Sequence, residues 1–231
     1  MVAPHSLFFW DPTMILLIPA LILGIWAQAK MRSAFSKYSK IRAASGMTGA
    51  QAARYLLDRA GLSNIAVEPI AGQLTDHYDP RGKVLRLSEG VYSSPSLAAL
   101  GVAAHEAGHA LQDKDGYWPM SVRSSLVPVA NLGSGMLWPL LLGGFLFHIP
   151  VLVSIGILLY SFAVLFQVVT LPVEFNASSR ALAVLEGSGA LHPDEIGGAR
   201  KVLSAAAMTY VAATLAAILT LIRLLILRDR Q

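Results

Sequence analysis

Four long apolar runs constrain the fold of this chain more than any other feature. They cover residues 12–29, 126–147, 150–171 and 205–222. About 20 consecutive apolar residues are enough for a helix to cross a bilayer. Hydrophobic residues make up 55% of the 231 positions and charged residues only 14%, so part of the chain should be solvated by lipid. The sequence therefore predicts a mainly α-helical membrane protein with about four transmembrane helices.

The first run is followed by a stretch rich in basic residues, namely Lys30, Arg32, Lys37, Lys40 and Arg42. A cleaved signal peptide is the alternative, and Ala27-Gln28-Ala29 resembles a cleavage site. However, the positive charge follows the run instead of preceding it. We therefore expect residues 1–29 to be a retained anchor. The basic stretch that follows it is expected to lie in the cytoplasm. Such basic flanks suit anionic lipid headgroups better than nucleic acid.

The second and third runs are separated only by His148 and Ile149, so residues 126–171 are expected to form a transmembrane helical hairpin. This hairpin returns the chain to the side of the membrane that it left. The fourth run predicts a C-terminal transmembrane helix within residues 205–231, closed by Arg223, Arg228 and Arg230. With four crossings these arginines reach the outer side, where positive charge is disfavoured.

Two polar segments, residues 30–125 and 172–204, lie between the runs. In the first, a capping box predicts a helix that starts after Thr48 and ends at Gly61. Strand-like runs follow at residues 66–70 and 83–87, and Ser94-Pro95 is typical of a helix start. We predict a small α+β domain here. The second strand is expected either to pair with a peptide as an edge strand or to pack in the core.

The sequence His105-Glu106-Ala107-Gly108-His109 lies on the helix predicted to follow Ser94-Pro95. Positions i and i+4 share one helix face, so both imidazoles can reach a single metal ion. Zinc would activate a water molecule for hydrolysis, and Glu106 would act as the general base. Gly108 in a helix interior indicates close packing or ligand access. The chain has no cysteine, so thiolate ligands and a cysteine nucleophile are excluded.

A catalytic zinc site needs a third protein ligand, and the predicted topology narrows the choice. His148 is at the far end of the hairpin, about 30 Å away at 1.5 Å per residue, and is excluded. Glu174 follows the third run directly, on the side of the motif, and is expected to open a helix over residues 175–185. His192 is on the same side and is the second candidate. An acidic residue favoured by a helix N-terminus is the alternative interpretation of Glu174.

Four segments, residues 74–80, 84–92, 103–112 and 173–181, resemble the YugP-like family of bacterial membrane proteins, described as putative neutral zinc metallopeptidases. With the arrangement of the apolar runs, the resemblance covers most of the chain. It implies peptidase activity and a zincin-like domain over residues 30–125. Residues 173–181 also resemble the glutamate-bearing helix of HtpX-like and CAAX prenyl peptidases, which favours Glu174 as a ligand. Those enzymes carry an acidic residue where Ser178 stands here.

His77 and Tyr78 are weaker candidates for catalysis. They could donate hydrogen bonds to the oxyanion formed at the scissile carbonyl. The alternative is that the pair stabilises the turn at Asp79-Pro80.

We therefore expect a multi-pass zinc metallopeptidase of the inner or plasma membrane, with its active site facing the cytoplasm. The expected metal ligands are His105, His109 and Glu174, the latter from a third-ligand helix and loop over residues 172–204. The expected partners are a peptide or membrane-protein substrate and the lipid bilayer, without nucleic acid; no oligomeric state is predicted.

A non-cleaving metal-binding adaptor and an intramembrane metalloprotease are the alternatives. The intact Glu106 disfavours the first, because a structural zinc site has no need of a base. The polar residues after residue 111 disfavour the second.

Overall fold

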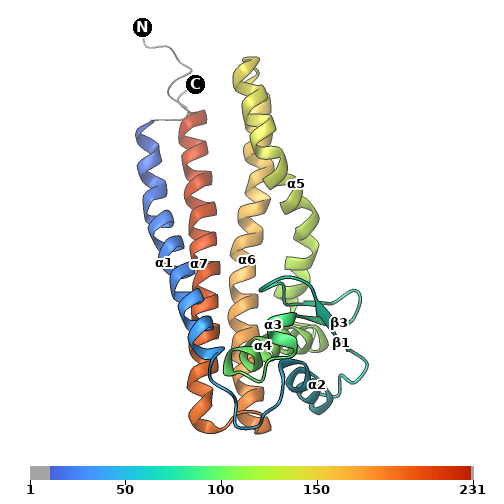
Figure 1. Cartoon of the computed structure of the whole chain (residues 1–231). Helices are drawn as coiled ribbons and strands as arrows, with labels where there is room; N and C mark the ends of the chain where they lie inside the picture. Colours follow the sequence, from blue (N-terminus) through green and yellow to red (C-terminus); the bar gives the residue numbers. More distant parts are fainter. Residues whose placement is uncertain (1–10, 230–231) are drawn as a thin grey trace. The chain divides into compact units, whose positions relative to one another are not determined.

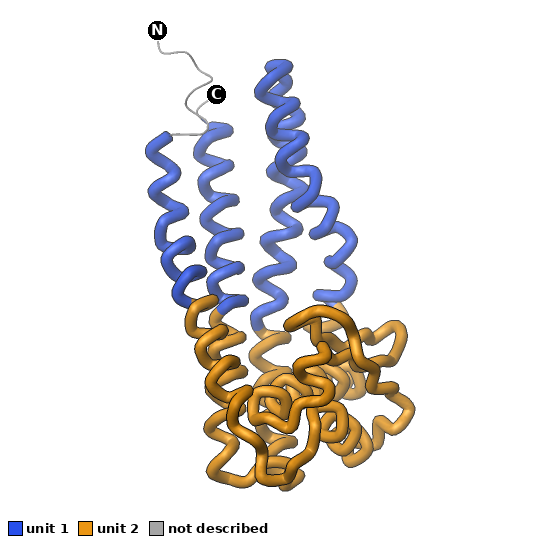
Figure 2. Tube along the Cα trace, in the orientation of Figure 1, with its two compact units in different colours: residues 1–26, 122–171, 209–231 blue, residues 27–121, 172–208 orange. Residues whose placement is uncertain are grey.

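The computed structural model describes residues 11–229, so the first ten residues of the predicted anchor and Arg230 lie outside the described part. The chain is mostly helical, with one small sheet (Figure 1). It divides into two compact units (Figure 2). The first unit comprises residues 1–26, 122–171 and 209–231, and the second comprises residues 27–121 and 172–208.

Four helices are long and apolar enough to cross a membrane, and each contains one of the predicted runs. They are α1 (Ile18–Tyr38, preceded by the 3₁₀ helix η1, Pro12–Leu17), α5 (Trp118–Leu146), α6 (Pro150–Ser188) and α7 (Pro193–Arg228). All except α1 are longer than one crossing requires, and the unit boundaries fall within these four helices.

Helices α5 and α6 form the predicted hairpin in the first unit. Leu137 and Leu141 of α5 pack with Val153 and Ile157 of α6. A Cβ atom on Gly133 would lie 2.1 Å from the backbone oxygen of Leu159, so only glycine allows the two helices to approach this closely.

The arginines at the end of α7 have acidic partners in the same unit. Arg223 lies 3.3 Å from the carboxylate of Asp11, and both side chains are buried. Arg228 lies 2.8 Å from Asp229. These pairs reduce the net positive charge at this end of the chain. They thus account for the arginines that the predicted topology places on the disfavoured side of the membrane.

In the second unit, helix α2 (Gly49–Arg59) begins with the predicted capping box. Thr48 and Gln51 each accept a hydrogen bond from the other's backbone N–H. Gly61 follows the helix with φ of +71°, a conformation that glycine adopts without strain.

The sheet has the strand order β1-β3-β2, where β1 is Ala66–Ile70, β2 is His77–Asp79 and β3 is Val84–Ser88. β3 pairs in parallel with β1 and antiparallel with β2. The possibility of β3 as a peptide-binding edge is therefore wrong, because both of its sides are occupied. The two outer strands, β1 and β2, form the edges of the sheet, and β2 is too short to give a sequence pattern.

Helix α4 (Leu97–Lys114) carries the His-Glu motif and lies in the main hydrophobic cluster of this unit. Its N-cap is Ser96, whose hydroxyl accepts a hydrogen bond from the Ala99 N–H at 3.2 Å. The prediction that Ser94-Pro95 starts the helix is therefore off by two residues. The short helix α3 (Glu89–Tyr92) connects the sheet to this segment.

Helix α6 continues without a break through Pro172 to Ser188. The prediction that Glu174 opens a separate helix is therefore wrong, because Glu174 lies within α6. Proline usually ends or kinks a helix by removing one backbone hydrogen bond. Here the following turns are held by contacts with α4, including a hydrogen bond from the Gln112 side chain to the carbonyl oxygen of Val173.

Candidate metal centre

Helix α4 presents His105 and His109 on one face, as their spacing predicts. The two ring centroids are 4.7 Å apart, and the ring planes are nearly perpendicular at 83°. His109 is buried and His105 is partly buried. The Nε2 atoms of both rings point towards a third side chain, which lies within 4 Å of each of them.

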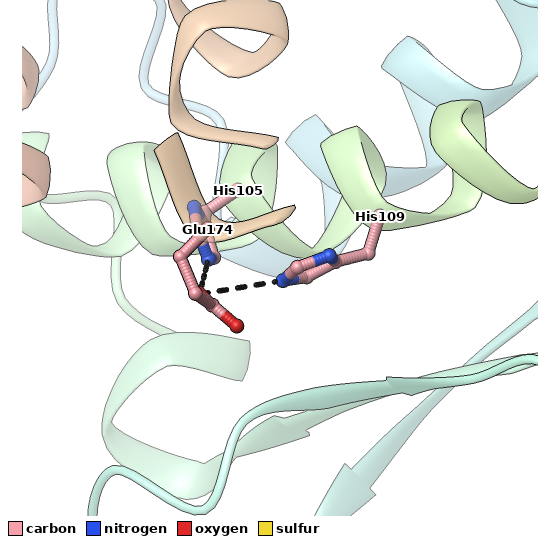
Figure 3. A group of neighbouring side chains, drawn as sticks. All are labelled: His105, His109 and Glu174. Carbon is pink, nitrogen blue, oxygen red and sulfur yellow. Dashed lines mark hydrogen bonds and ion pairs between the residues drawn. The ribbon is translucent and has the colours of Figure 1, made fainter. Parts of the chain in front are cut away.

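That third side chain is Glu174 of α6 (Figure 3). Its Oε2 atom lies 3.2 Å from Nε2 of His105 and 3.7 Å from Nε2 of His109. One potential ligand atom from each residue lies within 4.8 Å of the other two. Glu174 is only 2% exposed, so its carboxylate is held in this position by the protein.

Gly108 explains how α6 comes close enough to α4. A Cβ atom at this position would lie 2.5 Å from the backbone oxygen of Ala177, well inside van der Waals contact. The backbone of α6 therefore occupies the space that any larger residue would need. The close packing expected at Gly108 is present, and it places Glu174 beside the two histidines.

The other nitrogen of each imidazole also has a partner. Nδ1 of His105 lies 3.2 Å from the hydroxyl of Ser178, and Nδ1 of His109 lies 3.0 Å from Oε1 of Gln112. If Nδ1 carries the proton in both rings, each Nε2 presents a lone pair towards Glu174. This is the tautomer in which a histidine can bind a metal through Nε2.

The orientation of Gln112 is fixed by its own hydrogen bonds. Its side-chain N–H groups donate to the carbonyl oxygen of Val173 at 2.8 Å and to Oδ1 of Asn176 at 3.0 Å. Its oxygen must therefore face His109 and accept from Nδ1. Asn176 in turn accepts from Arg180, which also pairs with Asp115. This network was not predicted from the sequence, although Gln112 is three residues from His109 and thus on the same helix face.

Glu106 is buried on the same helix, and the backbone N–H of Tyr78 on β2 lies near enough to its carboxylate to favour the charged form slightly. Burial raises the pKa of Glu106 to about 7. A positive charge on His105 would act against this rise, whereas the carboxylates of Glu174 and Asp76 add to it.

The weaker candidates lie in different surroundings. The Tyr78 hydroxyl donates a hydrogen bond to Asp113 at 2.6 Å. His77, also on β2, has its Nδ1 atom 2.8 Å from the Thr75 carbonyl oxygen. His192 is exposed and lies 3.4 Å from Asp194, and it is not in the group that could hold a metal among the described residues.

The sequence was compared with known protein families. The family described as "Putative neutral zinc metallopeptidase" matches residues 13–229. The chain belongs to this family. Among curated relatives, the "Putative membrane protease YugP" of Bacillus subtilis (strain 168) is 51% identical over 208 residues, which are 90% of this chain and 92% of that protein. No solved structure gives a significant match. The relative's name and the four apolar helices together indicate a membrane protein.

Zinc, the metal in the family's description, fits the residues at this site. Two imidazoles and one carboxylate are a common donor set for catalytic zinc, which keeps a fourth position open. All three side chains are largely shielded from solvent, and both imidazoles have an Nδ1 partner that orients them. The Ser178 hydroxyl contacts His105 directly, 3.2 Å from its Nδ1 atom.

Proposed function

We propose that this protein is a zinc-dependent peptidase that hydrolyses peptide bonds close to the membrane surface. The observation that carries the proposal is the convergence of His105 Nε2 and His109 Nε2 on one carboxylate oxygen of Glu174. The buried Glu106 beside them supplies the acid–base group that hydrolysis needs.

His105, His109 and Glu174 would hold the metal. When bound, zinc would polarise the scissile carbonyl and make water more acidic, with a pKa of about 7. Gln112 keeps His109 in the required tautomer, and the Ser178 hydroxyl can accept the Nδ1 proton of His105 in the same way. Glu106 accepts the proton of the attacking water and passes it to the leaving amine. Burial raises the pKa of Glu106 above the usual value of a carboxyl group, which favours its uptake of a proton.

The substrate would be an extended peptide segment, from a peptide or from a membrane protein. Strand β2 forms one edge of the sheet, and the N–H of its central residue, Tyr78, reaches Glu106. A peptide that added to this edge would lie close to the general base. His77 on the same strand remains the candidate for oxyanion stabilisation, because the Tyr78 hydroxyl is held by Asp113.

We further propose that residues 30–125 act as a zincin-like domain, with residues 172–204 adding the third ligand, and that the site faces the cytoplasm. The basic residues that follow the first apolar run support this orientation. Helix α4 is not among the four described helices that could cross a membrane, which favours cleavage at the surface over cleavage within the bilayer.

Glu106 distinguishes this function from that of a non-cleaving metal-binding adaptor. A structural zinc site gains nothing from a buried carboxylate next to its ligands, and burial of this group is costly. A buried Glu106 beside three metal ligands therefore favours a catalytic zinc site over a structural one.

The test compares matched glutamate variants of the purified full-length protein in detergent. Glu174→Gln should weaken zinc binding by more than the roughly 10–100-fold typical of residues that only support a ligand, and should abolish cleavage of an unfolded protein. Glu186→Gln on the same helix removes only an exposed ion pair with Arg200 and should leave both unchanged. A chelator should stop cleavage by the wild type, and added zinc should restore it. Unchanged zinc affinity in Glu174→Gln would overturn the ligand assignment.

A further inference from the structure

A groove of about 430 Å³ lies between helices α1 and α7 in the second unit, separate from the metal centre. Lys30, Ser33 and Lys37 line it from α1, and Arg200, Lys201 and Ser204 line it from α7. The residues from α1 are spaced by three or four positions, so they share one helix face. Tyr38 forms part of the wall and packs against α7, where a Cβ atom on Gly198 would be 3.0 Å from its ring.

The groove is strongly positive. Four of its lining residues carry positive charge and none is acidic, and all of them belong to the described part of the chain. Arg200 pairs with Glu186 outside the lining at 3.0 Å, but both side chains are more than half exposed, so the pair is largely screened. Lys37 also lies 5.6 Å from the Tyr38 ring centroid. Like charges that line one groove repel each other unless an anion lies between them.

The position of the groove along both helices indicates the kind of anion. Lys30 directly follows the apolar run of α1, and Ser204 directly precedes the apolar run of α7. Both walls therefore change from apolar to basic at the same point. Lipid phosphates occupy this level of a bilayer, and basic pockets between transmembrane helices are known to hold anionic headgroups.

We propose that this groove binds the phosphate headgroup of an anionic phospholipid. The lysine and arginine side chains would supply charge-assisted hydrogen bonds to the phosphate, and the hydroxyls of Ser33 and Ser204 would supply further donors. A soluble phosphate ester offers the same chemistry without acyl chains. The apolar runs that adjoin the groove favour the lipid, because they provide a surface for its chains.

Native mass spectrometry of the full-length protein in detergent tests the proposal. The protein is titrated separately with dioctanoyl phosphatidylglycerol, dioctanoyl phosphatidylcholine and inorganic phosphate. Three forms are compared: wild type, the double variant Lys37→Gln/Lys201→Gln, and the control Arg32→Gln/Lys40→Gln. The control removes the same charge from basic residues outside the groove lining, so general attraction to anions changes equally in both variants.

We expect wild type and control to bind phosphatidylglycerol at least about tenfold more tightly than phosphatidylcholine, and the groove variant to lose this preference. Equal loss in both double variants would show diffuse electrostatics and overturn the site. Saturation by inorganic phosphate at the concentration that suffices for phosphatidylglycerol would overturn the lipid assignment. The measurement involves no peptide cleavage, so its outcome is independent of the proposed peptidase activity.

Discussion

The side-chain oxygen of Gln112 lies 3.0 Å from Nδ1 of His109, whereas Nε2 of the same ring faces Glu174. Gln112 is completely buried, and its amide group donates two further hydrogen bonds to α6. Gln112 therefore links the orientation of His109 on α4 to the backbone of α6, the helix that carries Glu174. Such supporting residues tune metal affinity in many proteins.

Gln112→Leu should lower zinc affinity by about 10–100-fold, because Nδ1 of His109 loses the acceptor that fixes its tautomer. The amount of bound zinc, measured against a competing chelator, checks this. Gln51→Leu is the control: it removes one of the two capping-box hydrogen bonds of α2 and should cost about 0.5–1.5 kcal/mol of stability without changing zinc affinity. Equal zinc affinity in Gln112→Leu and wild type would show that Gln112 only fills space.

Gly108→Ala should disturb the metal centre through packing alone. The new methyl group would lie 2.5 Å from the Ala177 oxygen, so α4 and α6 must move apart. We expect a loss of about 1–3 kcal/mol of stability and a clear drop in zinc affinity. Gly101→Ala on the same helix would meet only Ala199, at ordinary contact distances of 3.4 Å from its Cβ, 3.5 Å from its Cα and 3.8 Å from its backbone oxygen. It should be neutral or slightly stabilising, since alanine favours helix more than glycine does. Thermal unfolding and zinc titration of both variants distinguish the two outcomes.

Asp79 should make the sheet sensitive to acid. Hydrogen bonds from the N–H groups of Gly82 and Arg81, together with the nearby guanidinium of Arg86, hold the pKa of Asp79 below its usual value. Between the folded and unfolded pKa values the unfolded chain binds more protons, so this contribution to stability is present above about pH 4 and is lost as the pH falls. Asp79→Asn should therefore lower the melting temperature at pH 7, and the difference from wild type should shrink in acid. A difference that is constant with pH would contradict this.

The sequence predicted those features that depend on local spacing or on a simple rule of topology. The pairing of His105 with His109 follows from helix geometry, and the position of Glu174 followed from counting the membrane crossings. The continuation of α6 past Pro172 was not predictable, because it depends on contacts with α4. These contacts outweigh the tendency of proline to end a helix. Strand β2 was missed because three residues carry no periodicity. The role of Gln112 required knowledge of which groups of α6 face it.

The cytoplasmic orientation can be tested with single cysteines, because the natural chain has none. Ser45→Cys lies in an exposed loop of the polar segment before the motif. It should react with a membrane-impermeant thiol reagent only after cell lysis. His148→Cys, in the exposed turn between α5 and α6, should react in intact cells. The reverse labelling pattern would place the proposed active site outside the cell.

The most direct test of the proposed peptidase is to measure zinc content and cleavage together for wild type, Glu106→Gln and His109→Ala. Wild type should bind about one zinc ion per chain and cleave an unfolded protein substrate. Glu106→Gln should bind the same amount of zinc but cleave at least about 100-fold more slowly, because only the group that transfers the proton is lost. His109→Ala should lose both. Cleavage at the wild-type rate by Glu106→Gln, or loss of zinc from it equal to that from His109→Ala, would contradict the roles proposed for these residues.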